Sequence, residues 1–165
     1  MYRYQLGIPL SEYDDFVKEH PMVNLLQSSA WEKVKSDWNH ERLGVYEGEK
    51  LLAVASILIK SLPFGYKMFY IPRGPILDYR DTEVLKFVLQ SIKSYARSKK
   101  AIFVTFDPSI CQSQHLVNQD KTEYPENLVL VETLGQLGVK WSGQTAEMDD
   151  TIQPRIQAKI YKENY

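Results

Sequence analysis

The sequence predicts an α/β domain built around a mixed β-sheet. Short apolar segments with strand periodicity alternate along the chain with segments of helical periodicity. The longest apolar segment, Leu51–Ile59, suits a central strand covered on both faces. The chain has 165 residues, of which 44% are hydrophobic and 25% charged, a balance typical of one globular domain over residues 1–165.

The first segments of the chain predict a strand followed by a short helix. Residues Tyr2–Ile8 alternate loosely between apolar and polar side chains, and Pro9 ends that strand. Ser11 has a side chain suited to an N-cap, where its oxygen accepts a backbone N–H of the first turn. A helix is therefore expected over Glu12–Lys18.

A second helix is predicted to start at Ser29. Ser29 and Glu32 have the spacing of a capping box, in which each side chain satisfies a free backbone N–H of the first turn. The helix is expected to run to about Trp38. Trp31, Val34 and Trp38 would then share one face at spacing i, i+3, i+7.

A β-hairpin and two further strands form the predicted sheet. Arg42–Glu47 and Leu51–Lys60 flank a turn centred on Gly48, which is the pattern of a hairpin. Lys67–Ile71 follows the turn LPFGY and predicts the next strand. Ala101–Phe106 is apolar and predicts a buried strand.

The clearest helix is expected to begin at Asp81 or Thr82. Its buried stripe follows the helical period and comprises Leu85, Val88, Leu89, Ile92 and Ala96. Its end is basic, which suits the negative end of the helix dipole.

The last part of the chain predicts a long loop, a helix and two strands. The loop covers Ser109–Glu126, and the helix covers Asn127–Leu137 and stops at Gly138. Strands are expected over Val139–Ser142 and Thr151–Ile160. The whole order, β-α-α-β-β-β-α-β-α-β, resembles the N-acetyltransferase (GNAT-like) fold, an α/β (α+β) arrangement with helices flanking a mixed sheet.

Composition and missing signatures narrow the function. A net charge of −1 gives no support for a surface that coats nucleic acid. The single cysteine, Cys111, excludes an internal disulfide framework and fits a reducing compartment. The N-terminus lacks the apolar core of a signal peptide, so a cytoplasmic protein is expected. The chain contains no GxSxG, P-loop, GxGxxG, HExxH or CxxC pattern, and no metal or cofactor is expected.

An acetyl-CoA site is disfavoured by the segment before the clearest helix. Enzymes of this fold that use acetyl-CoA cradle its pyrophosphate on a glycine-rich loop at a helix N-terminus. The segment here is GPILDYRDT, which lacks a second glycine and contains two acids.

Lys35 is the first candidate for a substrate-binding residue. It lies four residues after Trp31, on the helix that is expected to present Trp31 and Trp38. A lysine there can neutralise a phosphate as a compact charge while the tryptophans wall a cleft. A lysine that only covers apolar surface explains the spacing equally simply, and spacing alone favours that reading.

Arg73 and Asp107 are two further candidates. Arg73 lies in the segment Tyr70–Tyr79, YIPRGPILDY, where prolines stiffen the backbone and Gly74 permits close approach. Its guanidinium suits a carboxylate or phosphate, or it ties the loop to Asp78 or Asp81. Asp107 follows the Ala101–Phe106 strand, at the carboxyl end where ligands gather in open α/β sheets, or it only caps the turn.

The loop Leu62–Lys67, LPFGYK, offers two interpretations. Exposed Phe64 and Tyr66 beside lysines would suit contact with a membrane surface. The alternative, which we favour on the sequence alone, buries both rings in the core.

Four segments in one order resemble a known family: LLQSSAWEKVKSDW, YIPRGPILDY, VTFDPSI and TIQPRIQAKIY. Together they are similar to the Fem family of tRNA-dependent peptidoglycan cross-bridge aminoacyltransferases, and within it to streptococcal members that add serine or alanine. The resemblance extends over essentially the whole chain. Family members are much longer and contain paired acetyltransferase-like subdomains, so the chain is expected to be the first subdomain of such an enzyme.

The resemblance implies a function and partners. The family transfers an amino acid from aminoacyl-tRNA to the stem-peptide lysine of a lipid-linked precursor, lipid II. It implies that Lys35 contacts the precursor's diphosphate and that Asp107 contacts its uridine or muramyl part. Arg73, Trp31 and Trp38 would border that site, and the residues for tRNA are expected outside this subdomain. The subdomain alone is then expected to bind and not to catalyse, with peripheral contact to the inner face of the membrane.

Two other functions remain open on the sequence. One is a small-molecule N-acetyltransferase of the same fold, and the other is a non-catalytic interaction module that docks through the LPFGYK loop.

Overall fold

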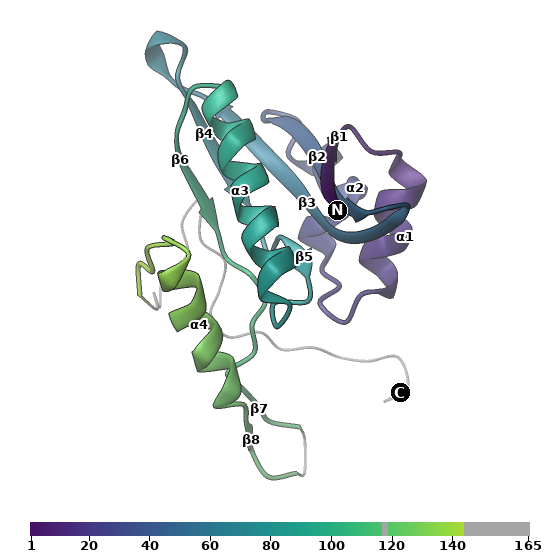
Figure 1. Cartoon of the computed structure of the whole chain (residues 1–165), viewed down its shortest axis with the longest axis vertical. Coiled ribbons are helices and arrows are strands. Elements are labelled where there is room, and N and C mark those ends of the chain that lie inside the picture. The colour runs from purple at the N-terminus through teal and green to yellow at the C-terminus, as the bar shows by residue number, and fades with distance from the viewer. Residues whose placement is uncertain (117–118, 144–165) are drawn as a thin grey trace.

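The computed structural model describes residues 1–116 and 119–143 and places a six-stranded mixed sheet at the centre (Figure 1). The strand order is β1-β2-β3-β4-β6, with β5 paired to β3. Neighbouring strands are antiparallel except β4 and β6, which are parallel. The strands are β1 (Tyr2–Leu6), β2 (Asn39–Glu47), β3 (Lys50–Ser61), β4 (Lys67–Ile71), β5 (Ile76–Leu77) and β6 (Ala101–Phe106).

Helices flank this sheet, and a small second sheet lies apart from it. The α-helices are α1 (Leu10–Glu19), α2 (Ser29–Val34), α3 (Thr82–Ser98) and α4 (Glu126–Gln136), and the 3₁₀ turns are η1 (Leu25–Gln27) and η2 (Pro63–Gly65). The second sheet pairs β7 (Ser113–Gln114) with β8 (Thr122–Glu123). The predicted α/β class with a mixed, helix-flanked sheet is confirmed.

Strand β3 separates two layers of the core because its side chains alternate between the two faces. Ala53, Ala55, Ile57 and Ile59 pack in one cluster with the buried side of α3 and with Leu134 of α4. On the opposite face, Val54 packs with Tyr13 and Val17 of α1. Both faces of β3 are covered, which explains its nearly continuous apolar sequence.

Helix α3 begins as predicted. The Asp81 carboxylate accepts a hydrogen bond from the backbone N–H of Val84 at 3.0 Å, so Asp81 is the N-cap. The predicted stripe faces the core, with Leu89 only partly buried. The helix lies along the sheet in Figure 1 and connects the parallel strands β4 and β6 through the β5 segment.

The start of α1 differs from the prediction. The helix begins at Leu10 after Pro9, and Ser11 lies inside its first turn and not at the N-cap. The carbonyl of Pro9 accepts the first helical bond, from the N–H of Tyr13 at 3.0 Å. Proline sets φ near the helical value, so it starts the helix without a capping side chain.

The predicted capping box of the second helix is wrong. The backbone N–H and the hydroxyl of Ser29 donate to the carboxylate of Asp14 at 2.9 and 2.5 Å. Glu32 forms an ion pair with Arg42, with Nη1 and Oε2 2.7 Å apart. Partners distant in the sequence therefore replace the local pair.

The second helix is also shorter than predicted, and its apolar face is different. It ends at Val34, which is 64% exposed. Trp38 lies beyond the helix, is 7% exposed, and packs on the sheet against Leu58, Met68 and Tyr70. The expected stripe of Trp31, Val34 and Trp38 does not form.

The C-terminal predictions are partly correct. The helix after the long loop and its stop at Gly138 are confirmed, with Gly138 at φ 86°. Strand β6 forms, but it is not buried, because β4 is its only strand neighbour within the described ranges. Ile102 and Phe103 are 58% and 46% exposed.

Three predictions concern the end of the chain. The Ser109–Glu126 loop contains the β7–β8 hairpin, which the sequence did not reveal. Residues Val139–Ser142 form no strand in the structure. The predicted strand Thr151–Ile160 and the segment TIQPRIQAKIY lie outside the described residues. Among the helices that are described, none combines the length and apolar composition needed to cross a bilayer.

Candidate functional site

The loop between β4 and β5 is held by hydrogen bonds to three of its backbone groups. The carbonyl of Pro72 accepts a bond from Gln27 Nε2 at 2.7 Å. The N–H of Arg73 donates to Asp107 Oδ1 at 2.8 Å. The carbonyl of Pro75 accepts from the Tyr79 hydroxyl at 3.1 Å. Arg73 has a φ of 53°, a left-handed conformation that a non-glycine residue adopts only when its surroundings fix it.

Gln27 anchors this loop to the layer of η1 and α1. It is completely buried, and its Oε1 accepts bonds from the N–H of Ser56 at 2.9 Å and the hydroxyl of Tyr13 at 3.3 Å. Gly74 lies directly against it, and a Cβ built there would lie 2.6 Å from Cδ of Gln27. The close approach therefore requires glycine at position 74. Gln27 was not among the predicted site residues, although it lies within the LLQSSAWEKVKSDW segment.

Asp107 lies where the parallel strands β4 and β6 end together. Ile71 pairs with Phe106, so the residues after each strand meet at one edge of the sheet. The carboxylate of Asp107 accepts bonds from the N–H of Arg73 and from the hydroxyl of Tyr70, at 3.3 and 3.4 Å for the latter. Burial raises the pKa of Tyr79 well above its ordinary value, and the charge of Asp107 adds to that rise.

Tyr70 connects Asp107 to Trp38. Its hydroxyl donates to Asp107, while its ring packs in one cluster with Trp38, Leu58 and Met68. Tyr70 is the first residue of the YIPRGPILDY segment, but its linking role depends on the β3–β4 pairing, which places Leu58 opposite it.

Backbone hydrogen bonds at the end of α2 join Trp31 and Lys35 to Trp38. The N–H of Lys35 donates to the carbonyl of Trp31 at 3.0 Å, and the N–H of Trp38 donates to the carbonyl of Lys35 at 3.0 Å. Both Trp31 and Lys35 are half-buried. We call the connected residues Lys35, Trp38, Tyr70, Arg73 and Asp107 the Tyr70 cluster.

The structure connects three of the five predicted site residues, Trp38, Arg73 and Asp107, and places Trp31 and Lys35 in the neighbouring turn at the end of α2. Arg73 and Asp107 are directly bonded, Trp38 joins them through Tyr70, and Trp31 and Lys35 join through backbone bonds at the end of α2. Asp78 and Asp81, the carboxylates weighed as ties for Arg73, accept the N–H groups of Arg80 and Val84, both at 3.0 Å.

The chemistry of the Tyr70 cluster suits binding. Its residues include a lysine, an arginine, a carboxylate oriented by two donors, and two aromatic side chains. Charged and planar groups of this kind recognise phosphate, sugar and base. Its five members include no serine, cysteine or histidine that would form a nucleophile–base pair.

The N-terminus of α3 is poorly suited to a pyrophosphate. The carboxylate of Asp81 accepts the N–H of Val84 in the first turn of this helix, and the carboxylate of Asp78 accepts the N–H of Arg80 just before it. An anion bound there would meet the negative charges of both carboxylates.

Comparison with protein families and curated proteins gives consistent matches. Residues 8–165 match the model of the FemAB family. A lipid II:glycine glycyltransferase of Staphylococcus epidermidis is 30% identical over 156 residues, which cover 92% of this chain and 35% of that protein. A protein of the same name from Staphylococcus aureus is 31% identical over 92% of this chain and 34% of its own length. The chain spans about a third of the length of these relatives.

Comparison with solved structures agrees with the family match and with the fold. The crystal structure of FemX is 31% identical, with a TM-score of 0.75 over 93% of this chain and 36% of that chain. Glucosamine-6-phosphate N-acetyltransferase from Arabidopsis thaliana is only 17% identical, with a TM-score of 0.54 over 93% of this chain and 99% of its own. The second likeness concerns the fold alone, and it confirms the acyltransferase fold that the element order predicted.

Proposed function

The chain belongs to the FemAB family, and on that premise we propose that it is the precursor-binding part of an aminoacyltransferase that builds peptidoglycan cross-bridges on lipid II. One observation carries the proposal: the chain is 30–31% identical, over 92% of its length, to proteins named lipid II:glycine glycyltransferase. The Tyr70 cluster supplies side chains that suit a lipid-linked precursor with phosphate, sugar and peptide groups.

In this proposal the residues of the cluster, together with Trp31, bind different parts of the precursor. Lys35 neutralises the diphosphate, and Asp107 accepts hydrogen bonds from the uridine or muramyl part. Trp31 and Trp38 provide apolar walls, and Arg73 borders the site and helps to fix the loop next to Asp107.

The reaction itself requires groups beyond this cluster. The stem-peptide lysine attacks the ester carbonyl of aminoacyl-tRNA as a neutral amine, a tetrahedral oxyanion forms, and the ester C–O bond breaks. The amine proton leaves and the tRNA hydroxyl is regenerated. We assign tRNA binding and oxyanion stabilisation to regions outside these 165 residues, because the chain spans about a third of its relatives.

The transferred amino acid is proposed to be serine or alanine. The motif resemblance points to the streptococcal members that add serine or alanine, of which MurM is the type, whereas the curated relatives carry glycine in their names. The enzyme is expected to work in the cytoplasm, where aminoacyl-tRNA is made. Parallel assays with seryl-, alanyl- and glycyl-tRNA distinguish the three amino acids, and a preference for glycyl-tRNA would overturn the MurM assignment.

Replacement of Lys35 tests precursor binding. In the full-length enzyme, Lys35→Ala is expected to raise KM for lipid II about tenfold with little change in kcat, because a lost phosphate contact removes roughly 1–1.5 kcal/mol of binding. Lys33→Ala is the matched control, since Lys33 is an exposed residue of the same helix. Equal kinetics for the two variants would remove Lys35 from the site.

Two further measurements test the rest of the proposal. The 165-residue chain is expected to bind the precursor without transferring an amino acid, and activity equal to that of the full-length enzyme would refute this division of labour.

Calorimetry with acetyl-CoA tests the alternative of a small-molecule N-acetyltransferase. We expect no saturable binding, because Asp78 and Asp81 occupy the start of α3.

A further inference from the structure

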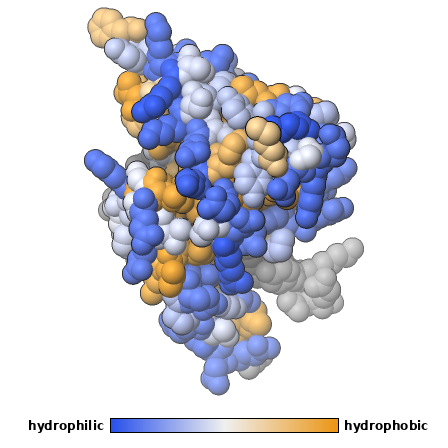
Figure 2. Space-filling view, viewed as in Figure 1, coloured by the Kyte–Doolittle hydropathy of each residue, from blue (hydrophilic) through white to orange (hydrophobic). Residues whose placement is uncertain are grey.

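The β3–β4 connection projects from one end of the molecule and exposes its aromatic side chains. It forms the steel-blue loop at the upper left of Figure 1, and Figure 2 shows hydrophobic surface at its tip. Phe64 is 96% exposed and Tyr66 is 47% exposed. The interpretation of these rings as core plugs is therefore wrong. A phenylalanine this exposed forgoes the favourable free energy of burying its ring unless another surface covers it.

The exposed tip is a defined structure. Within the connection, the N–H of Leu62 donates to the carbonyl of Tyr66 at 2.9 Å, and Phe64 has a φ of 60°. At its base, Lys67 Nζ donates to the Ser61 hydroxyl at 2.8 Å. The backbone N–H of Lys67 also bonds the carbonyl of Lys100 at 3.2 Å, which ties the connection to the segment after α3.

Within the connection, Leu62 packs against the cluster of Trp38 and Met68. The connection is thus attached to the sheet on the same face as the Tyr70 cluster. A body that is anchored through the tip would therefore keep the proposed precursor site at a fixed distance from whatever the tip contacts.

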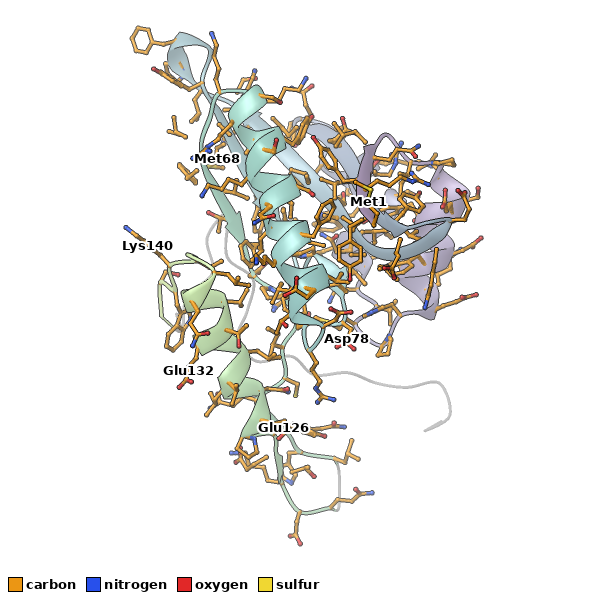
Figure 3. The ribbon with its side chains drawn as sticks, viewed as in Figure 1. Met1, Met68, Asp78, Glu126, Glu132 and Lys140 are labelled. Carbon is orange, nitrogen blue, oxygen red and sulfur yellow. The ribbon has the colours of Figure 1, made fainter. Side chains whose placement is uncertain are left out.

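Basic side chains predominate at the projecting end, although the exposed Asp37 lies two residues before Asn39, the β2 partner of Ile59. Residues 50–77 and 84–106 contain no aspartate or glutamate, and they supply both strands of the connection, most of α3 and all of β6. The lysines nearest to the base of the connection are Lys60, Lys67, Lys99 and Lys100. Figure 3 labels Glu126 and Glu132 on α4, and both lie far from Met68 near the connection. The net charge of −1 hides this local excess of basic residues.

We propose that the β3–β4 connection docks on an anionic lipid surface, with Phe64 inserted into the interface and the surrounding lysines on the headgroups. We call the lysines around the base of the connection, Lys60, Lys67, Lys99 and Lys100, the basic collar. The apolar tip suits the membrane interface, into which aromatic rings partition, and each lysine of the collar adds electrostatic attraction to the anionic headgroups. A single-stranded nucleic acid would instead require a groove or a flat platform on which bases stack. The biological purpose of the docking rests on the proposed function, because a lipid-linked acceptor resides in a membrane.

Sedimentation with lipid vesicles tests this inference. The chain is expected to bind vesicles containing roughly one-third phosphatidylglycerol, and to bind pure phosphatidylcholine vesicles much more weakly. Phe64→Ser is expected to lower the partition coefficient about tenfold. The matched control is Trp141→Ser, another aromatic residue, 65% exposed, after α4. It is expected to leave binding unchanged.

Charge reversal tests the basic collar. Lys60→Glu and Lys100→Glu are each expected to lower binding at least fivefold at roughly 0.1 M salt, and the exposed Lys140, replaced by Glu, serves as the control. Thermal melting by circular dichroism checks that each variant is folded. Equal binding by wild type and Phe64→Ser would overturn the proposal. Lysine-dependent binding of a single-stranded RNA, with no binding to vesicles, would also overturn it and identify a nucleic-acid surface.

The two proposals fail in different ways. Binding of a soluble, nucleotide-linked form of the precursor depends on Lys35 and not on Phe64, whereas vesicle binding depends on Phe64 and not on Lys35. If the chain binds the soluble precursor but not vesicles, the membrane proposal is wrong. If it binds vesicles but not the precursor, the proposed function is wrong.

Discussion

Gly74 and Gln27 fit together so closely that neither position tolerates an ordinary substitution. Gln27 uses its amide to hold Ser56 of β3 and Pro72 of the β4–β5 loop at once. The loop backbone reaches it only because Gly74 has no Cβ. The geometry of Arg73 and Asp107 depends on this contact, because the loop that carries Arg73 is fixed there.

Substitution of Gly74 measures the importance of this contact. Gly74→Ala is expected to lower the free energy of unfolding by about 1–3 kcal/mol, because the added methyl group forces Gln27 out of its hydrogen bonds. The measurement is a urea denaturation curve.

Gly135 provides the matched control for Gly74. A Cβ at this position in α4 would meet nothing within 4 Å. Gly135→Ala is therefore expected to be neutral or to stabilise by about 0.5–1 kcal/mol. Equal destabilisation by both substitutions would show that the contact with Gln27 has no special role.

At the scale of elements, α2 is a six-residue helix that depends on its neighbours. A helix this short is not stable alone, since nucleation costs more than a single turn returns. Asp14 of α1 binds its first residue, and Arg42 of β2 binds Glu32 in its middle. These two contacts position the end of α2, where Lys35 enters the proposed site.

Replacement of Asp14 tests this support. Asp14→Ala removes both bonds to Ser29 and is expected to lower the free energy of unfolding by about 1–2 kcal/mol. Asp15→Ala is the control, because Asp15 only approaches Lys18 at 3.8 Å on an exposed surface, and its effect should stay within about 0.5 kcal/mol. Chemical denaturation of both variants compares them. Similar losses would mean that α2 does not require Asp14.

At the scale of the whole molecule, the sheet and α3 form a well-packed body from which two smaller features extend. One is the β3–β4 connection, and the other is the β7–β8 hairpin with α4 (Figure 1). Strand β3 is paired on both sides and covered on both faces, whereas β7 and β8 pair over two residues each.

Amide hydrogen exchange should report this difference. Amides in the middle of β3 and α3 are expected to exchange at least about a hundredfold more slowly than those of β7 and β8, because they open only when the core opens. Mass spectrometry of peptides from each region measures the rates. Comparable protection of β7–β8 and β3 would contradict the described architecture.

Much of the fold could be predicted because the relevant signals are local. The β2–β3 hairpin follows from two apolar runs around Gly48, and α3 follows from its stripe and its Asp81 cap. The family was identifiable too, since its motifs are contiguous stretches of residues. In the same way, the sequence located Arg73 and Asp107 at the ends of their strands.

Only the tertiary structure decided the features that depend on partners far apart in the chain. Ser29 and Glu32 were predicted to pair with each other, but in the structure Ser29 bonds Asp14 and Glu32 pairs with Arg42. Trp38 does not lie on the predicted helical face, because it is buried against the sheet beside Tyr70. Phe64 remained outside because its hairpin extends past the core.

The sequence by itself determined the class of fold, its main strands and helices, and the family to which the chain belongs. The tertiary structure decided how Gln27, Asp107 and Tyr79 bind the loop around Arg73, and which aromatic residues face solvent. The physical reason is that the periodicity of strands and helices depends on residues that are close together in the sequence. Burial and hydrogen-bond pairing, in contrast, are settled by competition among residues that only the folded chain brings together.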